Sequence, residues 1–352
     1  IYISERYSIK MMKLLPFTVK PQIKTYLNYA YAFGIIEGNF GSNIIPRLIC
    51  DSYVNCIYCQ SNTNMFYIYS ADSWYEKKGI ISHESYVCKE ANLKCILEAL
   101  EIAKERLQKG EYIFCCPNEG YFFAKNNGKP YNFDHECLLW GIDYENRTFK
   151  SSNYINKIYS AYEIGFDELT NALINVQSGY VELLFFKANL NFKFEPLKVS
   201  NILELLDEYI SSKCSEITTN SDLKKYIDSG KIKFGISAWD ELIDYIDKVV
   251  QDEKSIDMRY IRSFLDHKHL MNLRLKYLAK NNYFSNPSLY TSKSEHILKI
   301  AKSILYISLK YEFTRDNNLL NKIITKIRGI NIVEREYIPE LINELTKYIS
   351  TN

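Results

Sequence analysis

The stretch "DHECLLWGIDYENRTFKSSNY", residues 134–154, predicts a β-hairpin and so decides how the first half of the chain folds. Residues 136–142 are an apolar run of the kind that forms a buried strand. The letters "DYENR" are rich in turn-forming residues, and "TFKSSNY" is typical of a returning strand. We therefore expect two antiparallel strands that are joined by a turn around Glu145 and Asn146.

This hairpin brings His135 and Asn153 together. His135 opens the outgoing strand and Asn153 lies near the end of the returning one, so both belong to the same end of the strand pair. Asp143 lies at the turn, and at roughly 3.3 Å per residue an extended strand holds it more than about 20 Å from His135. Of the two candidate partners, Asn153 is the one that we expect to orient the imidazole.

Length and composition favour a large globular protein with two domains. The chain has 352 residues, of which 47% are hydrophobic and 24% charged, so it can bury a sizeable core. Its 44 Lys and Arg residues balance 42 Asp and Glu residues, so no global field favours nucleic acid or an anionic membrane. No apolar stretch reaches the roughly 18 residues of a membrane-spanning helix, and the N-terminus shows no signal-peptide cleavage site. We therefore expect a cytoplasmic protein.

Cysteine and histidine spacing gives little support for a metal site. The nine cysteines are odd in number and irregularly spaced, which favours reduced thiols in a chain of this size. Cys56 and Cys59 have the spacing of half a zinc site, but no second pair matches them. His267 and His269 stand on different faces of a predicted helix. We predict no bound metal.

The pattern of hydrophobic residues changes near residue 190. We expect residues 1–11 to be an added or disordered start, residues 12–190 to form an α+β domain, and residues 198–352 to form a helical domain. In the first domain we predict helices at residues 91–110 and 166–179, two short strands within 111–126 around a Pro-Asn-Glu-Gly turn, and a strand at 180–188. In the second domain we predict helices at residues 201–214, 236–251, 256–280, 294–311, 319–327 and 339–349.

A histidine that opens a core strand, with an asparagine on the next strand, is half of a Cys-His-Asn site. The asparagine holds one ring nitrogen, and the other nitrogen accepts the proton of a thiol nucleophile. That thiol commonly lies at the N-terminus of a long helix, where the helix dipole lowers its pKa. Residues 28–39, "NYAYAFGIIEGN", predict such a helix with Asn28 as its cap, but Ala30 occupies the position where a cysteine is expected.

Three segments resemble one family. They are "PQIKTYLNYAYAFGII", the 134–154 hairpin, and "DMRYIRSFLDHKHLMNLRLKYL". They are similar to the cysteine-protease-like acyltransferases of antibiotic biosynthesis, the butirosin biosynthesis protein H type, and especially the amide synthetase type of closthioamide-like polythioamide assembly. That family has a Cys followed by Tyr in the first segment, and His, a "GYD"-like turn, and Asp or Asn before Tyr in the second. "HECLLWGID" and "SSNY" match this pattern, whereas Ala30 replaces the cysteine.

The resemblance implies a papain-like or C39-like first domain and an amide-forming acyltransferase activity. A carrier protein would deliver an acyl thioester on its phosphopantetheine, the thiol would take the acyl group, and an amine would resolve the acyl-enzyme without another cofactor. His135 would then be the base and Asn153 its positioning partner. With Ala30, whether engineered or native, the molecule is expected to be inactive.

The resemblance also implies supporting roles for other residues. The expected oxyanion donors are the backbone N–H groups from Asn28 to Ala30, with Gln22 as a side-chain contributor and Asp143 in a supporting role. Expected acyl-lining residues are Tyr26, Tyr29, Tyr31, Phe33 and Trp140; expected carrier-protein contacts are Arg259, Arg262 and Lys268. Simpler interpretations stay open, since His135 can be a core histidine, Asp143 a turn residue and the basic face merely solvated. Two other functions also stay open: a cysteine peptidase or thioesterase of the same fold, and a non-catalytic binding protein.

Overall fold

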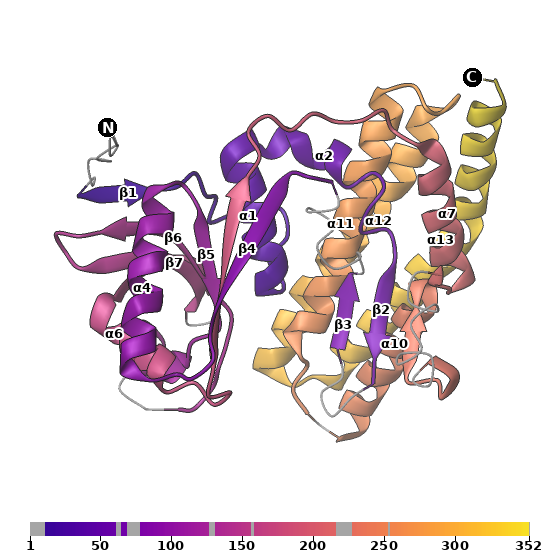
Figure 1. The fold of residues 1–352 in the computed structure, drawn as a ribbon. Helices are drawn as coiled ribbons and strands as arrows, with labels where there is room; N and C mark the ends of the chain where they lie inside the picture. Colours follow the sequence, from indigo (N-terminus) through magenta and orange to yellow (C-terminus); the bar gives the residue numbers. More distant parts are fainter. Residues whose placement is uncertain are drawn as a thin grey trace. The chain divides into compact units, whose positions relative to one another are not determined.

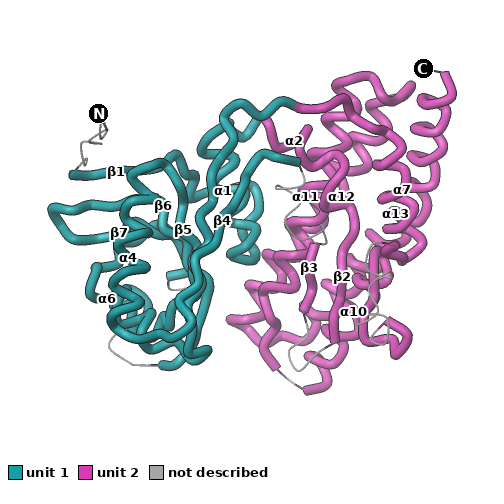
Figure 2. Tube along the Cα trace, in the orientation of Figure 1, with its two compact units in different colours: residues 1–43, 75–193 teal, residues 44–74, 194–352 magenta. Residues whose placement is uncertain are grey.

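The computed structural model describes residues 11–60, 65–68, 78–126, 131–155, 158–215, 227–252 and 254–351. The chain forms two compact units, which Figure 2 shows in two colours: residues 1–43 with 75–193, and residues 44–74 with 194–352. The expected start at residues 1–11 lies outside the described residues except for Met11. The second unit therefore includes a segment of the first half of the chain, unlike the predicted division at residue 190.

The first unit is an α+β unit around one antiparallel sheet, which confirms the predicted fold class at that level (Figure 1). The strand order is β4-β9-β5-β6-β7-β8, and β1 pairs with β6. The strands are β1 (Met12–Leu14), β4 (Ile81–Cys88), β5 (Tyr112–Cys115), β6 (Cys137–Asp143), β7 (Thr148–Ile155), β8 (Ile158–Gly165) and β9 (Val181–Ala188). The helices are α1 (Leu27–Phe40), α4 (Leu93–Gln108), η2 (Glu119–Tyr121), α5 (Phe123–Asn126) and α6 (Phe166–Ile174).

The predicted hairpin is confirmed as the pair β6 and β7. Ile142 lies opposite Phe149, and the strands run antiparallel. The turn is stabilised by Asp143, whose carboxylate accepts the backbone N–H groups of Glu145 at 3.0 Å and Asn146 at 3.1 Å. Such a side-chain bond to the backbone two or three residues ahead is the reason that Asp favours turns. Asp143 thus has a structural role at the end of the hairpin away from His135.

Helices α1 and α4 pack on opposite faces of this sheet. The guanidinium of Arg106 in α4 lies 4.9 Å from the centre of the Phe185 ring, and Phe185 is paired with Ile113 of β5. The ring of Tyr31 in α1 lies 6.2 Å from that of Phe114, the next residue of β5. Successive residues of a strand point to opposite faces. Helix α4 therefore covers one face, in front of the strands in Figure 1, and α1 covers the other.

The segment after β5 turns into short helices instead of the predicted second strand. The side chain of Asn118 accepts the N–H of Gly120 at 3.2 Å and donates to the carbonyl of Asn175 at 2.9 Å. Gly120 also packs against the chain at Tyr131, because a Cβ there would lie 1.6 Å from that carbonyl oxygen. These local bonds begin η2 directly after β5, and side-chain capping of this kind competes with strand pairing.

The second unit combines a small sheet with long helices. Its strands, in the order β10-β2-β3, are β2 (Cys56–Cys59), β3 (Met65–Ile68) and β10 (Ile232–Phe234). Its helices include α2 (Ile45–Leu48), α7 (Val199–Ser211), α10 (Gly235–Asp252), α11 (Met258–Lys280), α12 (Pro287–Thr314) and α13 (Asn317–Thr351). Phe234 lies opposite Ile57 in the sheet. This pairing is the reason that residues 44–74 join the second half of the chain.

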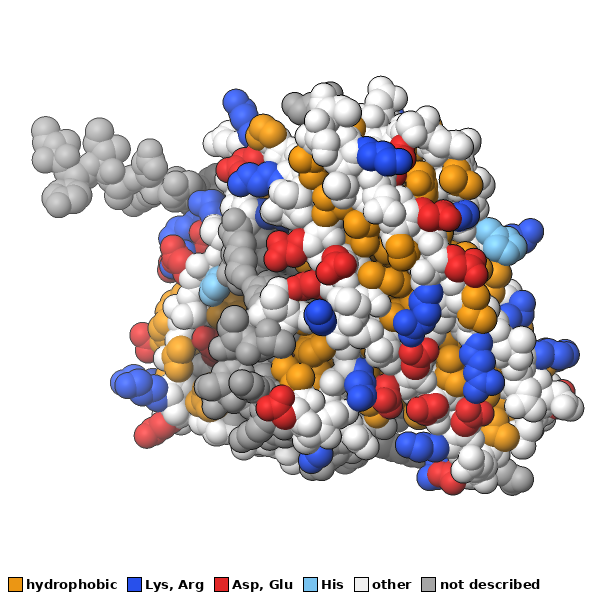
Figure 3. Space-filling model, turned by 90° about the vertical axis from the view of Figure 1, so that its right-hand side faces the viewer, with side chains coloured by type: hydrophobic (Ala, Val, Ile, Leu, Met, Phe, Trp, Pro, Cys, Tyr) orange, Lys and Arg blue, Asp and Glu red, His pale blue; other side chains and the backbone are white. Residues whose placement is uncertain are grey.

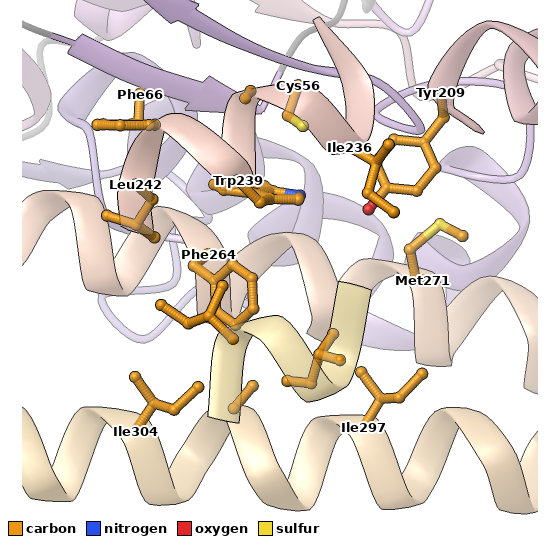
Figure 4. Close-up of a cluster of buried hydrophobic side chains, with 14 of the residues drawn as sticks. Cys56, Phe66, Tyr209, Ile236, Trp239, Leu242, Phe264, Met271, Ile297 and Ile304 are labelled. Carbon is orange, nitrogen blue, oxygen red and sulfur yellow. The ribbon is translucent and has the colours of Figure 1, made fainter. Parts of the chain in front are cut away.

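Trp239 of α10 occupies the middle of the helical core (Figure 4). The side chain is fully buried. Its ring centroid lies 6.4 Å from that of Phe66 in β3 and 5.0 Å from that of Phe264 in α11. The Trp239 side chain thus packs helix α10 against both the small sheet and helix α11.

Helix α13 merges the two last predicted helices into one. Pro339 lies inside it and is exposed, so its ring and its missing N–H face away from the core. The neighbours Tyr337, Ile338 and Leu341 are buried. Burial of these side chains outweighs the local cost of the proline, which a sequence pattern alone does not reveal. None of the helices in the described part of the chain combines the length and apolar character that a membrane crossing requires.

Candidate functional site

A carboxylate lies between His135 and Asn153. Oε2 of Glu119 is 3.3 Å from Nδ1 of His135 and 3.4 Å from Nδ2 of Asn153. Nδ2 of Asn153 also donates to the carbonyl of Glu136 at 3.3 Å. Asn153 is fully buried, whereas the side chain of His135 is 33% exposed. The two residues that the hairpin was predicted to bring together are therefore joined through Glu119, and the imidazole keeps access to solvent.

Lys125 completes this cluster. Its ammonium forms an ion pair with Oε2 of Glu119, and both side chains are only 7% exposed. Burial raises the pKa of Glu119, but hydrogen bonds and charge from His135 and Lys125 outweigh it, so the net pKa is lower than usual. Burial also lowers the pKa of Lys125, and Glu119 partly offsets this. Glu119 is therefore the ionised centre of the cluster.

Helix α6 anchors Glu119 on its own side of the sheet. The N–H of Asn118, the residue before Glu119, donates to the carbonyl of Ala172 in α6 at 3.0 Å. Lys104 of α4 lies 4.5 Å from the centre of the Phe166 ring at the start of α6, so α4 and α6 share one face. Glu119 thus approaches His135 from the side that α4 and α6 cover.

Helix α1 reaches the same end of the hairpin from the other face. The hydroxyl of Tyr31 lies 3.1 Å from the carbonyl oxygen of Glu136 and 3.0 Å from that of Ser152. These residues neighbour His135 and Asn153, and Tyr31 neighbours Ala30. Helix α1 and both hairpin strands therefore meet at a single hydroxyl group.

The start of α1 differs from the prediction in its cap. Tyr26 is the N-cap, and Asn28 lies inside the first turn, where its Oδ1 accepts the N–H of Tyr29 at 2.8 Å. The N–H of Ala30 donates to the carbonyl of Tyr26 at 3.0 Å, and Ala30 is fully buried. The amides of Tyr29 and Ala30, which were expected to act as oxyanion donors, are thus already bonded within the helix. The backbone N–H of Gln22 likewise donates to Glu37, at 2.7 Å.

An apolar cavity of about 140 Å³ lies beside the first turns of α1. It is lined by Asn28, Tyr31, Ala32, Ile35, Ile81, Phe114, Leu184 and Phe186. Of the five aromatic residues that were expected to line an acyl site, Tyr31 is the one in this lining. Trp140 instead stacks on Phe17, with ring centroids 5.6 Å apart. Tyr26 and Tyr29 contact each other at 5.8 Å, and Phe33 is fully buried.

The expectation that Lys268 belongs to a basic face for a carrier protein is wrong, because the side chain is buried. It is 1% exposed, because Nζ donates to both carboxylate oxygens of Glu334, at 2.8 and 2.7 Å, and to the hydroxyl of Tyr209 at 3.0 Å. Arg259 is exposed but paired with Asp257, the cap of its own helix, and Arg262 is half-buried. Acidic and basic side chains are interspersed among hydrophobic ones on the face that Figure 3 shows.

Two cysteines form a disulfide, contrary to the expectation of reduced thiols. Cys88 ends β4 and Cys95 lies in the first turn of α4, and their Cα atoms are 6.1 Å apart, a separation that a disulfide spans. Cys56 and Cys59, the candidate half of a zinc site, lie on β2, and Sγ of Cys56 contacts the carbonyl of Gly235. The described residues contain no group of three or more His, Cys, Asp and Glu that could hold a metal ion.

Sequence reasoning missed Glu119 and Lys125. The signal was the pairing of β5 with β6: Cys115 lies opposite Cys137, and an isolated bridge joins Asn118 to Asp134. An antiparallel pair that continues past the strand ends brings residue 119 close to residue 135. The sequence does not state which strand lies beside the hairpin, so this partner could not be selected from the sequence.

No protein-family model matches this chain, and no curated protein is significantly similar to it.

Proposed function

We propose that the first unit is an acyl-transfer unit of the cysteine-peptidase type. With a thiol at position 30, it takes an acyl group from a carrier-protein thioester and passes it to an amine. The observation that carries the proposal is the junction at Tyr31, where one hydroxyl bonds to Glu136 and Ser152. The sequence neighbours of these three residues are Ala30, His135 and Asn153. These are the three positions at which a thiol, a base and a supporting amide are required.

Glu119 supplies the orientation that was first assigned to Asn153. Its carboxylate accepts a hydrogen bond from Nδ1–H of His135, which leaves Nε2 as the basic nitrogen. Asn153 donates to the same carboxylate oxygen and so holds Glu119 in place. The supporting amide, the carboxylate and the imidazole therefore lie in series, and this order leaves Nε2 of the imidazole to activate a nucleophile.

The chemistry follows from these positions. His135 accepts the proton of the thiol, and the thiolate attacks the thioester carbonyl. The phosphopantetheine thiolate leaves and takes up that proton, so an acyl-enzyme forms without ATP or a metal. The amine then attacks the acyl-enzyme, His135 accepts its proton, and that proton returns to the enzyme thiol as the amide departs. With Ala30 the first bond cannot form, and the chain binds its ligand without turnover.

The experiment is acylation of the Ala30→Cys protein. It is incubated with an acyl-loaded carrier protein, with and without a diamine, and its intact mass is followed. The matched control is Ala103→Cys, which places the same thiol at another fully buried alanine of the first unit, in α4 and outside the cavity lining. We expect an adduct to form at least about tenfold faster at position 30, because His135 accepts the proton of that thiol alone. Discharge of the adduct as amide supports the synthetase.

Other outcomes of this experiment separate the competing functions. Discharge of the adduct by water alone would support a thioesterase or peptidase of the same fold. Equal acylation of both variants would show that His135 does not activate position 30, and would overturn the proposal. The alanine at position 30 favours a second candidate function, a binding protein that performs no covalent step. If neither thiol became acylated, this function would replace the proposed acyl transfer.

A further inference from the structure

The cavity beside α1 has an uncharged, nearly apolar lining. Its lining residues include two phenylalanines, three aliphatic side chains and one alanine, and none of the eight is charged. They come from α1 and from strands β4, β5 and β9. Ile35 and Ile81 are each 1% exposed. The cavity is therefore formed between helix α1 and the sheet, and not by a loop.

The two polar side chains in the lining are already engaged. The Tyr31 hydroxyl is bonded to the carbonyls of Glu136 and Ser152, so this residue presents its ring to the cavity. Oδ1 of Asn28 accepts the N–H of Tyr29. Asn28 is the exposed member of the lining and therefore marks the rim. An ion placed inside would lose its hydration and find no opposite charge, which is strongly unfavourable.

The size of the cavity sets the size of its ligand. The cavity opens to solvent at the Asn28 rim, and its volume of about 140 Å³ is close to the volume of about 150 Å³ of an apolar cavity in another protein that binds benzene. We propose that this cavity binds an uncharged, apolar group of about six carbon atoms. The binding claim stands on the cavity alone; that the bound group is the acyl chain rests on the proposed function. On that basis the acyl substrates are short and uncharged.

The first test uses benzene and the chain with Ala30 unchanged. Ligand-observed NMR and thermal unfolding are measured with benzene, with benzoate of the same ring size, and with the larger naphthalene. We expect saturable binding of benzene and a rise of Tm with its concentration, since a ligand of the folded state stabilises it. We expect benzoate and naphthalene to bind at least tenfold more weakly, because one is charged and the other exceeds the cavity.

The second test locates the site by filling it. Ala32→Met and, separately, Leu184→Phe add side-chain volume within the lining, and each should weaken benzene binding at least tenfold. The matched control is Ala279→Met in α11, which makes the same substitution in the second unit and should leave benzene affinity unchanged. A crystal structure of the benzene complex then shows where the ligand lies.

Three results would overturn the inference. They are absence of saturable benzene binding, unchanged affinity in both filling variants, and benzene density outside this cavity. If Ala279→Met also lost binding, the crystal structure would decide between the cavity and another site. Failure of the acylation experiment leaves these measurements untouched, because they need no thiol. If both proposals hold, Ala30→Cys should accept six-carbon acyl donors at least tenfold faster than twelve-carbon donors, and Ala32→Met should reduce that preference.

Discussion

The carboxylate of Glu119 lies 3.3 Å from Nδ1 of His135, although the two residues are separated by a helical turn, a short helix and a connecting segment. The contact forms because β5 and β6 run antiparallel and their pairing continues beyond the strand ends to Asn118 and Asp134. It fixes one ring nitrogen of a histidine that is otherwise partly open to solvent. The orientation of His135 thus depends on a residue outside the hairpin.

The first prediction concerns this orientation. In the Ala30→Cys protein, Glu119→Gln should slow acyl-adduct formation by at least about tenfold, because an amide no longer favours the tautomer with its basic nitrogen at Nε2. Asn153→Ala should have a smaller effect, since it removes the side-chain bonds to Glu119 and to the Glu136 carbonyl but leaves the Glu119–His135 contact in place. Adduct formation is followed by intact mass. Glu163→Gln, which changes a half-exposed partner of Lys150, is the control and should react at the parent rate. A larger loss from Asn153→Ala would return the orienting role to Asn153.

The second prediction concerns stability in acid. The pKa of Glu119 is lowered in the folded chain, since the contributions of His135 and Lys125 exceed the effect of burial. A lowered carboxyl pKa gives a stabilisation that is fully present above the unfolded value of about 4.3 and is lost as pH falls through the folded value. The free energy of unfolding should therefore fall below about pH 4.3, and Glu119→Gln should reduce that dependence. Urea unfolding from pH 7 to pH 3 measures both, and an unchanged acid slope in the variant would contradict the assignment.

The sequence predicted elements whose signal is local. The hairpin was predictable because its apolar run, turn residues and return strand are contiguous, and Asp143 stabilises the turn from within it. The helix of residues 91–110 was predictable for the same reason: Asn92 caps the first turn, and Gly110 ends it with a positive φ of 90°. Each of these features depends on residues within a few positions of each other.

The features that the sequence did not predict depend on contacts between residues far apart in the chain. The strand of Cys56 and Cys59 joins the second unit because Phe234 pairs with Ile57, and no local pattern connects residues so far apart. Lys268 has the sequence context of a surface lysine, yet its partner Glu334 lies 66 residues away. The same limit hid Glu119 from the candidate site. Long-range partners of charged residues are thus the part of this molecule that the sequence left open.

The third prediction concerns the buried ion pair of the helical unit. Lys268→Met should destabilise the protein by about 3–5 kcal/mol, because Glu334 would remain buried without a counter-charge. The double variant Lys268→Met with Glu334→Leu should recover most of that loss, since both charges are removed together. Urea denaturation of the single and double variants measures the coupling.

An exposed ion pair on the same helix provides the control. Lys276 pairs with Glu295, and their side chains are 47% and 55% exposed. Lys276→Met should therefore cost less than about 1 kcal/mol. Equal losses for Lys268→Met and Lys276→Met would mean that burial does not determine the strength of the Lys268 contact.

The fourth prediction concerns His267, whose neutral form the fold requires. Its Nε2 lies 2.8 Å from the carbonyl of Val54, and among the described residues no partner reaches its buried Nδ1. Burial lowers the pKa of His267 well below 6.5, and the charges of Lys268 and Arg274 lower it further, against the bond to Val54. Below about pH 6.5 His267 binds a proton in the unfolded chain but stays neutral in the folded chain. Stability should therefore fall as the pH is lowered.

The size of this effect follows from the same linkage. Between pH 7 and pH 5 the His267 contribution should reduce the free energy of unfolding by about 2 kcal/mol. His267→Gln keeps a donor for the Val54 carbonyl but does not titrate, so it should flatten the pH dependence; His296→Gln, at an exposed position of α12, should not. His269 also has a pKa lowered by burial and by Lys302 and Lys276, so a smaller slope should persist in His267→Gln. An undiminished slope would show that protonation of His267 does not limit the stability of the helical unit.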